Sequence, residues 1–492
     1  MAQAQQQPKP FVRRNRAGRV VILFLVIFGA GIIPTTAQTD SLPPLPDAAL
    51  LADPVFARPG FAEVAIPYLN RTRYRLALSV DPVRGRIAGR AEVIFVNHSG
   101  VPLSNVIFRL YPNHPTHGAR TMTIQSVTLD GSPTSGQTLD SDQTIYEIRL
   151  AVPLAVGGTA IFLFDYTITL PGAGFFYVSE PFPMVAVYDS SGWRTEVATN
   201  GLDYAYSESA LYAVNLRAPT DVNTWFVGQL KASQPYEDGT STYTIVTGPV
   251  RNFILIQARG WGSFELSGGP VPVRVLYAGN QETAQQIATI ARDVFTFFEA
   301  NFGGYPYAGF DVVIMRFPSG GEEYPGLVFI NNERNAAYWR FIAAHEVAHQ
   351  WFYGIAGNDT LRHAWLDESL AQIAGYLFYL KTEYAGAGSA ATYWQSILTW
   401  YNRIVTVRPI DTPLDQYRDF ADYMSTTYGG GAVFLRDLAE HMGVDAFIDG
   451  LRDYVREVNL GIGTPCQFYG AMQRQIGIDL REMFAARVGI TC

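Results

Sequence analysis

Between residues 68 and 268 the chain alternates short apolar runs with polar turns. The segment RAEVIFV at residues 90–96 begins with polar and apolar side chains in alternation, which is the period of a strand with one buried face. Turn-forming segments such as DGSPTSG at residues 130–136 separate these runs. Further runs of this kind occupy residues 74–80, 106–110, 144–150, 160–169, 243–247 and 253–257. The pattern predicts an antiparallel β domain, which we place at residues 61–268.

After residue 270 the period of the apolar positions changes from that of a strand to that of a helix. One more strand is expected at residues 271–277, and the helix predicted at 280–301 places Ile287, Val294 and Phe298 on one face. Strands are expected at residues 310–315 and 327–330, on either side of a glycine-rich stretch at 319–326. Later helices are predicted at residues 336–354, 364–385, 390–405, 430–442, 444–457 and 464–477. The chain is therefore predicted to be multi-domain, with an α+β domain at residues 269–492 after the β domain.

Composition excludes several classes of protein. Of the 492 residues, 48% are hydrophobic and 13% aromatic, which is enough apolar surface for large cores and rules out global disorder. A net charge of −8 does not fit a nucleic-acid-binding surface. Two cysteines are too few for a disulfide-dense scaffold or for a four-cysteine zinc module.

The N-terminal segment predicts export. An uncharged stretch at residues 20–34 follows a basic run at residues 13–19, which is typical of a signal peptide or a single-pass membrane anchor within residues 1–40. Residues 41–60 are rich in Pro, Ala and Asp and are expected to form a linker. Membrane contact is predicted only through the N-terminal segment. In an oxidising compartment Cys466 and Cys492 are expected to form a bridge, with two free thiols as the alternative.

The segment HEVAH at residues 345–349 is the clearest candidate for chemistry. Residues four apart on an α-helix share a face, so the imidazoles of His345 and His349 can hold one Zn²⁺. Glu346 is not expected to bind the metal, but it can reach a water molecule held there. The alternative is a surface helix with a chance histidine pair, and a chain with seven histidines seldom contains this motif by chance.

A catalytic zinc usually has three protein ligands and one open position. Glu368, in the segment WLDESLA, lies 19 positions after His349, a spacing that allows a helix end, a loop and an antiparallel return. His345, His349 and Glu368 would thus form a thermolysin-like His₂Glu set that binds one zinc ion per chain. We interpret His363 as a structural residue. Asp367 is expected to be either a solvated acid or an acid that supports the site.

These motifs together resemble the aminopeptidase N family of zinc metallopeptidases, the gluzincins, which includes leukotriene A4 hydrolase. The segment GGEEYPGL at residues 320–327 lies where that family has its GxMEN exopeptidase motif. YGGGA at residues 428–432 resembles the family's Tyr-x-Lys-Gly-Ala segment, and residues 201–219 resemble the final strands of its β domain. The resemblance covers residues 65–490 and implies an α+β thermolysin-like catalytic domain at residues 269–492.

The resemblance implies a role for each matching residue. Glu346 would be the general base that takes a proton from a water held at the metal and passes it to the leaving amine. Tyr428 would donate a hydrogen bond to the oxyanion, the alternative being a core tyrosine at a helix start. Glu323 would bind the free α-ammonium of the substrate, the alternative being a solvated loop acid. Gly320 and Gly321 would let an edge backbone run alongside the peptide substrate.

The chain also departs from the family pattern. Glu322 replaces the family's Met, and Tyr324 replaces its Asn; the Lys after the catalytic Tyr is replaced by Gly430. Glu322 either adds a second negative charge to the amine site or faces solvent. The family's long C-terminal helical domain is not expected here, and the active-site cleft is therefore expected to be more open.

Taken with the resemblance, the sequence predicts an exported zinc aminopeptidase that acts on peptides with a free N-terminus and has no nucleic-acid partner. The alternatives are an open-cleft zinc endopeptidase, a hydrolase of a non-peptide substrate, and a non-catalytic binding module on the same fold. The last alternative predicts the loss of a ligand, of Glu346 or of Tyr428, and all of these residues are present. The sequence carries no signal for the oligomeric state or for the preferred N-terminal residue.

Overall fold

The computed structural model describes residues 41–53, 58, 60–115, 121–170, 172, 174–196, 206–317, 319–384, 386 and 388–492. They belong to one compact unit, Thr39–Cys492. The predicted signal or anchor segment at residues 1–40 lies outside the described residues, as does part of the predicted linker. Within the ranges described, no helix has both the length and the apolar character needed to cross a membrane.

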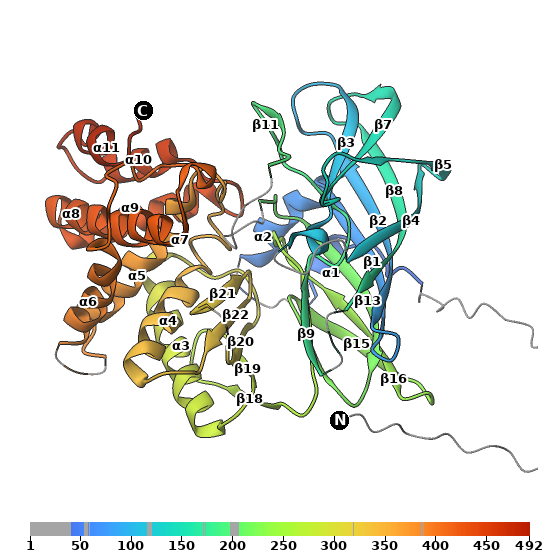
Figure 1. The fold of residues 1–492 in the computed structure, drawn as a ribbon, viewed down its shortest axis with the longest axis horizontal. Helices are drawn as coiled ribbons and strands as arrows, with labels where there is room; N and C mark the ends of the chain where they lie inside the picture. Colours follow the sequence, from blue (N-terminus) through green and yellow to red (C-terminus); the bar gives the residue numbers. More distant parts are fainter. Residues whose placement is uncertain are drawn as a thin grey trace, which may run out of the picture. The chain divides into compact units, whose positions relative to one another are not determined.

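The largest element of the β-rich N-terminal region is an eight-stranded sheet (Figure 1). In order across the sheet, its strands are β15 (Gln229–Pro235), β16 (Thr240–Val246), β13 (Leu211–Pro219), β1 (Arg73–Asp81), β2 (Arg86–Val96), β8 (Thr159–Thr169), β4 (Met122–Leu129) and β5 (Ser132–Thr134). Buried and more exposed residues alternate along β8, as expected for a half-buried strand. All neighbouring pairs are antiparallel except β1 and β13, which pair in parallel. The two strands are far apart in the sequence, so no hairpin constrains their relative direction.

Smaller sheets pack around this one. They comprise β10 (Met184–Val185), β3 (Leu103–Arg109), β7 (Ile145–Leu154) and β6 (Gln137–Thr138); β14 (Asn223–Phe226), β17 (Ile254–Ala258) and β9 (Phe175–Ser179); and the pair β11 (Tyr188–Asp189) and β12 (Gly192–Trp193). Phe108 of β3 packs its ring edge-on against Phe162 and Phe164 of β8, at centroid distances of 5.0 and 4.8 Å. These aromatic contacts join the four-stranded sheet to the large one.

The C-terminal region contains a mixed five-stranded sheet. Its strands, in spatial order, are β18 (Gly262–Leu266), β19 (Val273–Tyr277), β20 (Phe310–Met315), β22 (Leu327–Asn331) and β21 (Gly321–Tyr324). β21 lies at the edge of the sheet, within the glycine-rich stretch at residues 319–326, where the apolar pattern predicted no strand. The sheet also begins before the predicted boundary at residue 268, because β18 pairs with β19 rather than with the β region.

Helices cover this sheet and form the rest of the C-terminal region. α3 (Gln281–Phe302) buries the apolar face predicted for it, including Ile287, Val294 and Phe298. α4 (Ala336–Ala348) contacts both β22 and β21. The other helices of this region are η5 (Ala364–Leu366), α5 (Glu368–Lys381), α6 (Ser389–Tyr401), η6 (Leu414–Gln416), α7 (Phe420–Tyr423), the π-helix η7 (Met424–Gly431), α8 (Ala432–Met442), α9 (Val444–Val458), α10 (Pro465–Gln473) and α11 (Arg481–Arg487). Short helical turns of the N-terminal region are α1 (Ala48–Leu51), α2 (Phe61–Ala65), η2 (Ile66–Asn70) and η3 (Tyr111–Asn113).

Helix boundaries differ from the prediction where glycine or irregular backbone intervenes. α4 ends at Ala348 rather than near residue 354, because the chain turns back and the N–H of Gly354 donates to the carbonyl of His349. Tyr353 in this turn has a φ of 129°. The helix predicted from residue 430 is preceded by α7 and the π-helix η7, so helical backbone begins at Phe420.

Buried polar contacts join the β-rich region to the helical region. Arg251 donates hydrogen bonds to the carbonyl oxygens of Ser207 at 2.9 Å and of Gly461 at 2.8 Å, and Ser209 Oγ donates to that of Leu460 at 2.7 Å. Gly357 packs on the Arg251 guanidinium so closely that a Cβ would lie 2.1 Å from Arg251 Cζ. The two regions are therefore fitted against each other close to the loop that follows α4.

The predicted bridge between Cys466 and Cys492 is confirmed. It ties α10 to the last described residue across a sequence separation of 26 residues. The closed loop contains α11, whose Phe484 packs against Phe434 and Phe468 in the helical core.

Candidate active site

Helix α4 presents His345 and His349 side by side. The Asn335 side chain caps the start of the helix by accepting a hydrogen bond from the N–H of Tyr338. The Nε2 atoms of the two histidines lie 3.2 Å apart, and both side chains are buried. Nδ1 of His349 lies 3.1 Å from the carbonyl oxygen of Phe352, a contact that fixes the ring with Nε2 directed towards His345. The helix thus sets two nitrogen donors one turn apart.

Glu368 brings a carboxylate to this pair. It is the first residue of α5, and its Oε2 lies 3.1 Å from Nε2 of His345 and 3.6 Å from Nε2 of His349. The three donor atoms lie within 4.8 Å of one another. Burial opposes the ionisation of Glu368, but its contacts with the two histidines hold the pKa of this carboxyl well below its usual range. Two imidazole nitrogens and one ionised carboxylate match the donor set of a catalytic zinc, so these residues fit that ion.

Asp367 caps the start of the helix that carries Glu368. Its Oδ1 accepts a hydrogen bond from the N–H of Glu368 at 2.7 Å, and its Oδ2 accepts one from Asn358 Nδ2 at 3.0 Å. The Asp367 side chain is buried, and burial together with the charge of Glu368 raises its pKa well above the ordinary value. Of the two expectations for Asp367, the solvated acid is wrong, and the supporting acid stays a prediction.

His363 is not one of the converging donors among the described residues. Its Nδ1 lies 2.7 Å from Oδ1 of Asp411, which also accepts a hydrogen bond from Trp365 Nε1 at 2.9 Å. These contacts fit the structural interpretation of His363, because they fasten the turn before α5 to the segment around residue 411.

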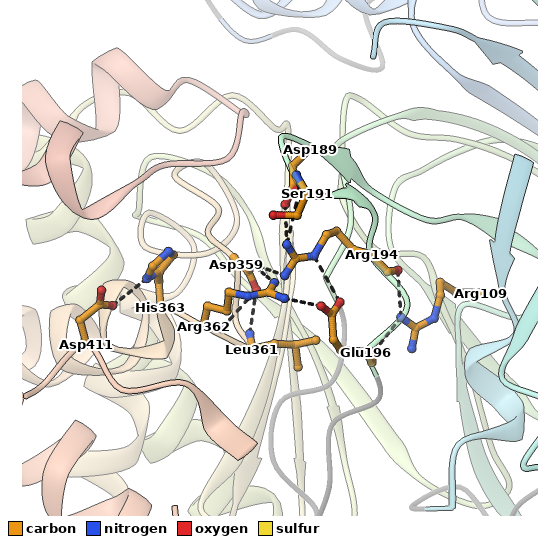
Figure 2. A network of polar contacts seen from close by, with 10 residues as sticks. All are labelled: Arg109, Asp189, Ser191, Arg194, Glu196, Asp359, Leu361, Arg362, His363 and Asp411. Atoms are coloured by element: carbon orange, nitrogen blue, oxygen red, sulfur yellow. Dashed lines mark hydrogen bonds and ion pairs between the residues drawn. The ribbon is translucent and has the colours of Figure 1, made fainter. Parts of the chain in front are cut away.

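A network of arginines and acids fastens the loop between α4 and α5 to the β-rich region (Figure 2). Arg194 donates to Asp189 at 3.0 Å and to Glu196 at 3.2 Å, and its third nitrogen lies 3.6 Å from Oδ2 of Asp359. Arg362 donates to Asp359 at 2.9 Å and also contacts Glu196. The Arg194 and Asp359 side chains are both buried, so the contact between them is more strongly shielded from solvent than an ordinary surface ion pair, whereas Glu196 is exposed. It holds the loop that leads to Glu368.

Glu346 lies on the side of α4 that faces strand β21. Its carboxylate, that of Glu323 and the imidazole of His349 form a second group whose atoms lie within 4.8 Å of one another. The Glu346 side chain is buried, and burial, reinforced by the charges of Glu323 and Glu368, raises its pKa well above the ordinary value. Burial and neighbouring acids are typical causes of the raised pKa values found in catalytic acids and bases.

The two glycines before Glu322 allow β21 to lie against α4. A Cβ at Gly321 would lie 2.4 Å from Cδ of Glu346, and a Cβ at Gly320 would lie 2.5 Å from Cδ1 of Ile342. Any other residue would push the strand away from the helix. The glycines thus have a packing role on α4, in addition to the predicted one of leaving the strand edge free for a peptide.

Side chains along β21 point alternately to its two sides. Gly321 and Glu323 lie on the side of α4, which we call the metal face; Glu322 and Tyr324 lie on the opposite side, which we call the tyrosine face. Glu322 accepts hydrogen bonds from Tyr324 Oη at 2.5 Å and from Tyr177 Oη at 3.4 Å. It is partly buried between two phenols, so the expectation that it faces solvent is wrong. Burial raises the pKa of Glu323 to about 7, although the nearby His349 opposes the shift.

Tyr428 reaches the histidine pair from the π-helix η7. Its ring lies 5.7 Å from that of His345 and 5.6 Å from that of Tyr423. Two of the three glycines after it are tightly packed: a Cβ at Gly429 would lie 2.5 Å from the backbone N of Tyr401, and one at Gly431 would lie 2.0 Å from Ser369 Oγ. Short π-helical segments are often found at functional sites, and here one carries the candidate oxyanion donor.

The sequence analysis missed Glu180, which follows β9 in the β-rich region. Its side chain is fully buried, and one carboxylate oxygen accepts a hydrogen bond from Asn252 Nδ2 at 2.7 Å. Burial, reinforced by the charge of Glu322, raises the pKa of Glu180 to about 8. No local pattern separates this acid from a surface residue, because only the packing of β9 beside β21 brings it to the site.

The chain resembles known zinc peptidases in sequence. A model described as the Peptidase family M1 domain matches residues 288–486. Aminopeptidase 2, mitochondrial, of Saccharomyces cerevisiae is 27% identical over 238 residues, which is 43% of this chain and 24% of that protein. Aminopeptidase N of Streptomyces lividans is 27% identical over 218 residues, 40% of this chain and 25% of that protein. The aligned stretches thus span about a quarter of the length of these relatives.

Solved structures share the fold over nearly the whole chain. The M1 zinc metallopeptidase of Deinococcus radiodurans superposes with a TM-score of 0.64 and 19% identity, covering 86% of this chain and 95% of that one. A mutant of that protein bound to a Tyr-Ser-Ala substrate superposes with a TM-score of 0.62 and 18% identity, covering 86% and 95% of the two chains. The predicted architecture, a β domain followed by a thermolysin-like α+β domain, is confirmed by these neighbours.

Proposed function

We propose that the chain is a zinc-dependent aminopeptidase of the M1 family that removes N-terminal residues from peptides, a proposal supported by the matching family model and by the relatives. One observation gives the main support for the proposal. The His345, His349 and Glu368 donors and the Glu323–Glu346–His349 group share a single buried centre next to the edge strand β21. This arrangement combines a metal-binding set, a general base and an acid suited to an α-ammonium.

His345, His349 and Glu368 would hold one zinc ion per chain. When bound, the ion supplies Lewis acidity, which polarises the scissile carbonyl and lowers the pKa of water. The role of the protein is to keep the three donors together. Two contacts support this role: that of the Phe352 carbonyl with Nδ1 of His349, and the hydrogen bond from the backbone N–H of Glu368 to the Asp367 carboxylate.

Glu346 would act as the general base. In this proposal it takes a proton from the attacking water and delivers it to the nitrogen of the leaving amine. Its burial and its raised pKa support the assignment, because a carboxylate of ordinary acidity is a weaker base at neutral pH. Gly321 keeps the base close to the edge of β21, where a peptide would lie.

Tyr428 would donate a hydrogen bond to the oxyanion that forms on the substrate carbonyl. The 5.7 Å separation of its ring from that of His345 supports this role, because it brings the phenol next to the donor set. The π-helix carries the side chain towards the histidine pair without adding bulk at the three glycines that follow it.

Glu323 would bind the free α-ammonium of the substrate. A partly buried carboxylate whose pKa is raised to about 7 gains a great deal from a cationic partner, which restores its ionised form. An N-acetylated peptide has no such charge, so the proposal predicts strong discrimination against it.

The proposal is tested by assaying the purified protein on one peptide with a free N-terminus and on its N-acetylated twin. Cleavage is expected for the free peptide alone, with release of its first residue. Removal of metal by a chelator, or the change Glu346→Gln, should abolish it, and zinc should restore activity only in the chelated wild type. Glu237→Gln, which changes an exposed acid in the turn between β15 and β16, serves as the matched control.

Two results would contradict the proposal. Equal cleavage of the free and acetylated peptides would indicate an endopeptidase with an open cleft. No cleavage of either peptide by a zinc-loaded protein would indicate a binding module or a different substrate.

We also propose that the protein works outside the cytoplasm. The bridge between Cys466 and Cys492 supports this location, since such bonds persist in oxidising compartments. The basic and apolar N-terminal segment points to the same location. Expression of the whole chain in a bacterial host, followed by protease treatment of spheroplasts, should digest residues after 40 from outside. Protection of the protein from protease until the cells are lysed would contradict export.

A further inference from the structure

The tyrosine face of β21 carries an acid that the chemistry on the metal face does not use. Glu322 lies directly opposite Phe329 of β22, on the same side of the sheet as Tyr324. Tyr324 and Tyr177 each donate a hydrogen bond to one of its carboxylate oxygens. Two phenols from different regions of the chain therefore hold this carboxylate in one orientation, although it replaces an apolar residue of the family motif.

A second acid lies close to this face. Glu180 is fully buried, and its Oε2 has no hydrogen-bond partner within the described part of the chain. Across the described residues no Lys or Arg forms an ion pair with Glu180 or Glu322; their polar partners are Asn252 and the two tyrosines. Buried carboxylates normally have a cationic partner. A cationic group from outside the chain would give this face the partner that its described residues do not provide, and would favour the ionised form of the two acids.

The way a peptide substrate would lie at β21 indicates which of the substrate's groups can reach Glu322. A peptide that lies along the open edge of β21 extends the sheet by one strand. With the contacts proposed above, the α-ammonium of the first residue would lie at Glu323 and its scissile carbonyl at the metal donors, both on the metal face. The two other substituents of its Cα are a hydrogen and the side chain, and the side chain would extend towards the tyrosine face.

We propose that Glu322 is a specificity-determining residue that receives the cationic side chain of an N-terminal Lys or Arg. The inference rests on the proposed aminopeptidase function and names its preferred substrate class. The partly exposed ring of Tyr177, 5.2 Å from that of Phe329, offers an apolar wall to the aliphatic stem of such a side chain. The carboxylate then binds the charged end. An uncharged side chain of equal length leaves the negative charge unpaired, and an acidic side chain is repelled.

The test compares L-lysine with L-norleucine, which has an unbranched alkyl side chain but no side-chain ammonium. Their binding is measured by calorimetry on the zinc-loaded Glu346→Gln protein, which cannot turn over a substrate. L-lysine is expected to bind about 10-fold tighter or more, the range for a hydrogen bond to a charged group. Adding Glu322→Gln should bring the two affinities within about twofold of each other. Adding Glu237→Gln instead should leave the ratio unchanged.

Tyr177→Phe provides a second variant in case Glu322→Gln disturbs folding. It keeps the charge and removes one phenol that orients it, so the lysine preference should decrease without disappearing. Thermal unfolding and zinc content of each variant are measured alongside. These readouts separate a change of specificity from a loss of structure.

Three results would overturn the inference: equal binding of the two amino acids, no binding of either, or an equal loss of affinity for both on Glu322→Gln. The last would mean that Glu322 acts on the α-ammonium rather than on the side chain. Hydrolysis is read separately, with lysyl and norleucyl amides and the wild-type protein. A lysine preference in binding without any hydrolysis would contradict the proposed function while supporting Glu322 as a cation-binding residue.

Discussion

The two faces of strand β21 carry adjacent glutamates in different surroundings. On the metal face, Glu323 lies with Glu346 and His349, all from the helical region. On the tyrosine face, Glu322 accepts one hydrogen bond from Tyr324 of its own strand and one from Tyr177 of the β-rich region. The proposed reactive groups thus all belong to the helical region. The surface proposed to meet the substrate side chain is formed by both the helical region and the β-rich region.

This difference separates chemistry from selectivity. The reactive centre depends on α4, α5 and β21, which are held together by close packing at Gly321. The tyrosine face depends on how β9 lies against β21, through the contact of Ser179 with Tyr324. A change at the contact between the two regions can therefore alter which peptide is preferred while leaving the metal donors in place.

The largest effect is expected from Glu368→Gln, which takes away the carboxylate donor on the metal face. Zinc content should fall, and kcat/KM should drop by about 10³-fold or more, because polarisation of the carbonyl and activation of water are both lost. If the two faces act independently, the ratio of L-lysine to L-norleucine affinity should survive. Zinc analysis, kinetics and calorimetry on one preparation check this, and a lost ratio would show that the faces are not separable.

Gly321→Ala should break the close packing of the metal face. The new Cβ would lie 2.4 Å from Cδ of Glu346, so either the strand or the base must move. A displacement of about 1 Å is expected to lower kcat by about 100-fold. Gly304→Ala is the control, because a Cβ there meets no atom within 4 Å. Unchanged kcat in Gly321→Ala protein with normal zinc content would contradict the role given to this packing.

Neighbouring glycines of the π-helix allow a smaller, paired test. A Cβ at Gly431 would lie 2.0 Å from Ser369 Oγ, whereas one at Gly430 would have its nearest contact at 3.6 Å, an ordinary distance. Gly431→Ala should shift the segment that carries Tyr428 and reduce kcat by about 10-fold, part of the loss expected for removing an oxyanion donor. Gly430→Ala should stay within about twofold of wild type. Equal kcat in the two variants would argue against Tyr428 as that donor.

The disulfide should affect stability far more than chemistry. Replacing Cys466 and Cys492 by Ser removes a link across 26 residues, worth about 3.5 kcal/mol in the chain-entropy account. The melting temperature should fall, while kcat/KM at 25 °C stays within about twofold, because the bridge lies away from both faces of β21. Thermal unfolding with and without reductant checks this, and an unchanged melting temperature would contradict a stabilising role.

Local sequence patterns made much of the fold and of the candidate site predictable. The spacing of His345, His349 and Glu368 depends on helix geometry, and the switch of apolar period marks the change from strands to helices. The alternation of side chains along a strand separates Glu322 from Glu323 once β21 is recognised. The strand itself was missed, because glycines hide its apolar period.

Other features depend on contacts between distant segments and leave no local trace. The parallel pairing of β1 with β13, the membership of β18 in the C-terminal sheet and the burial of Glu180 arise only when the two regions pack together. The same holds for the environment of Glu322, whose partner Tyr177 is 145 positions away. The sequence alone could not decide whether Glu322 faced solvent, because one of its two hydrogen-bond partners lies on β9 and not on its own strand.

The central claim is that the metal face of β21 recognises a free N-terminus through Glu323. The most direct measurement is the ratio of kcat/KM for a free peptide to that for its N-acetylated twin, in wild type and in Glu323→Gln. The ratio is expected to be about 100-fold or more in wild type, from a charge-assisted bond that the acetylated peptide cannot form, and to fall to within about threefold in the variant. An unchanged ratio in Glu323→Gln protein with full zinc content would contradict the account.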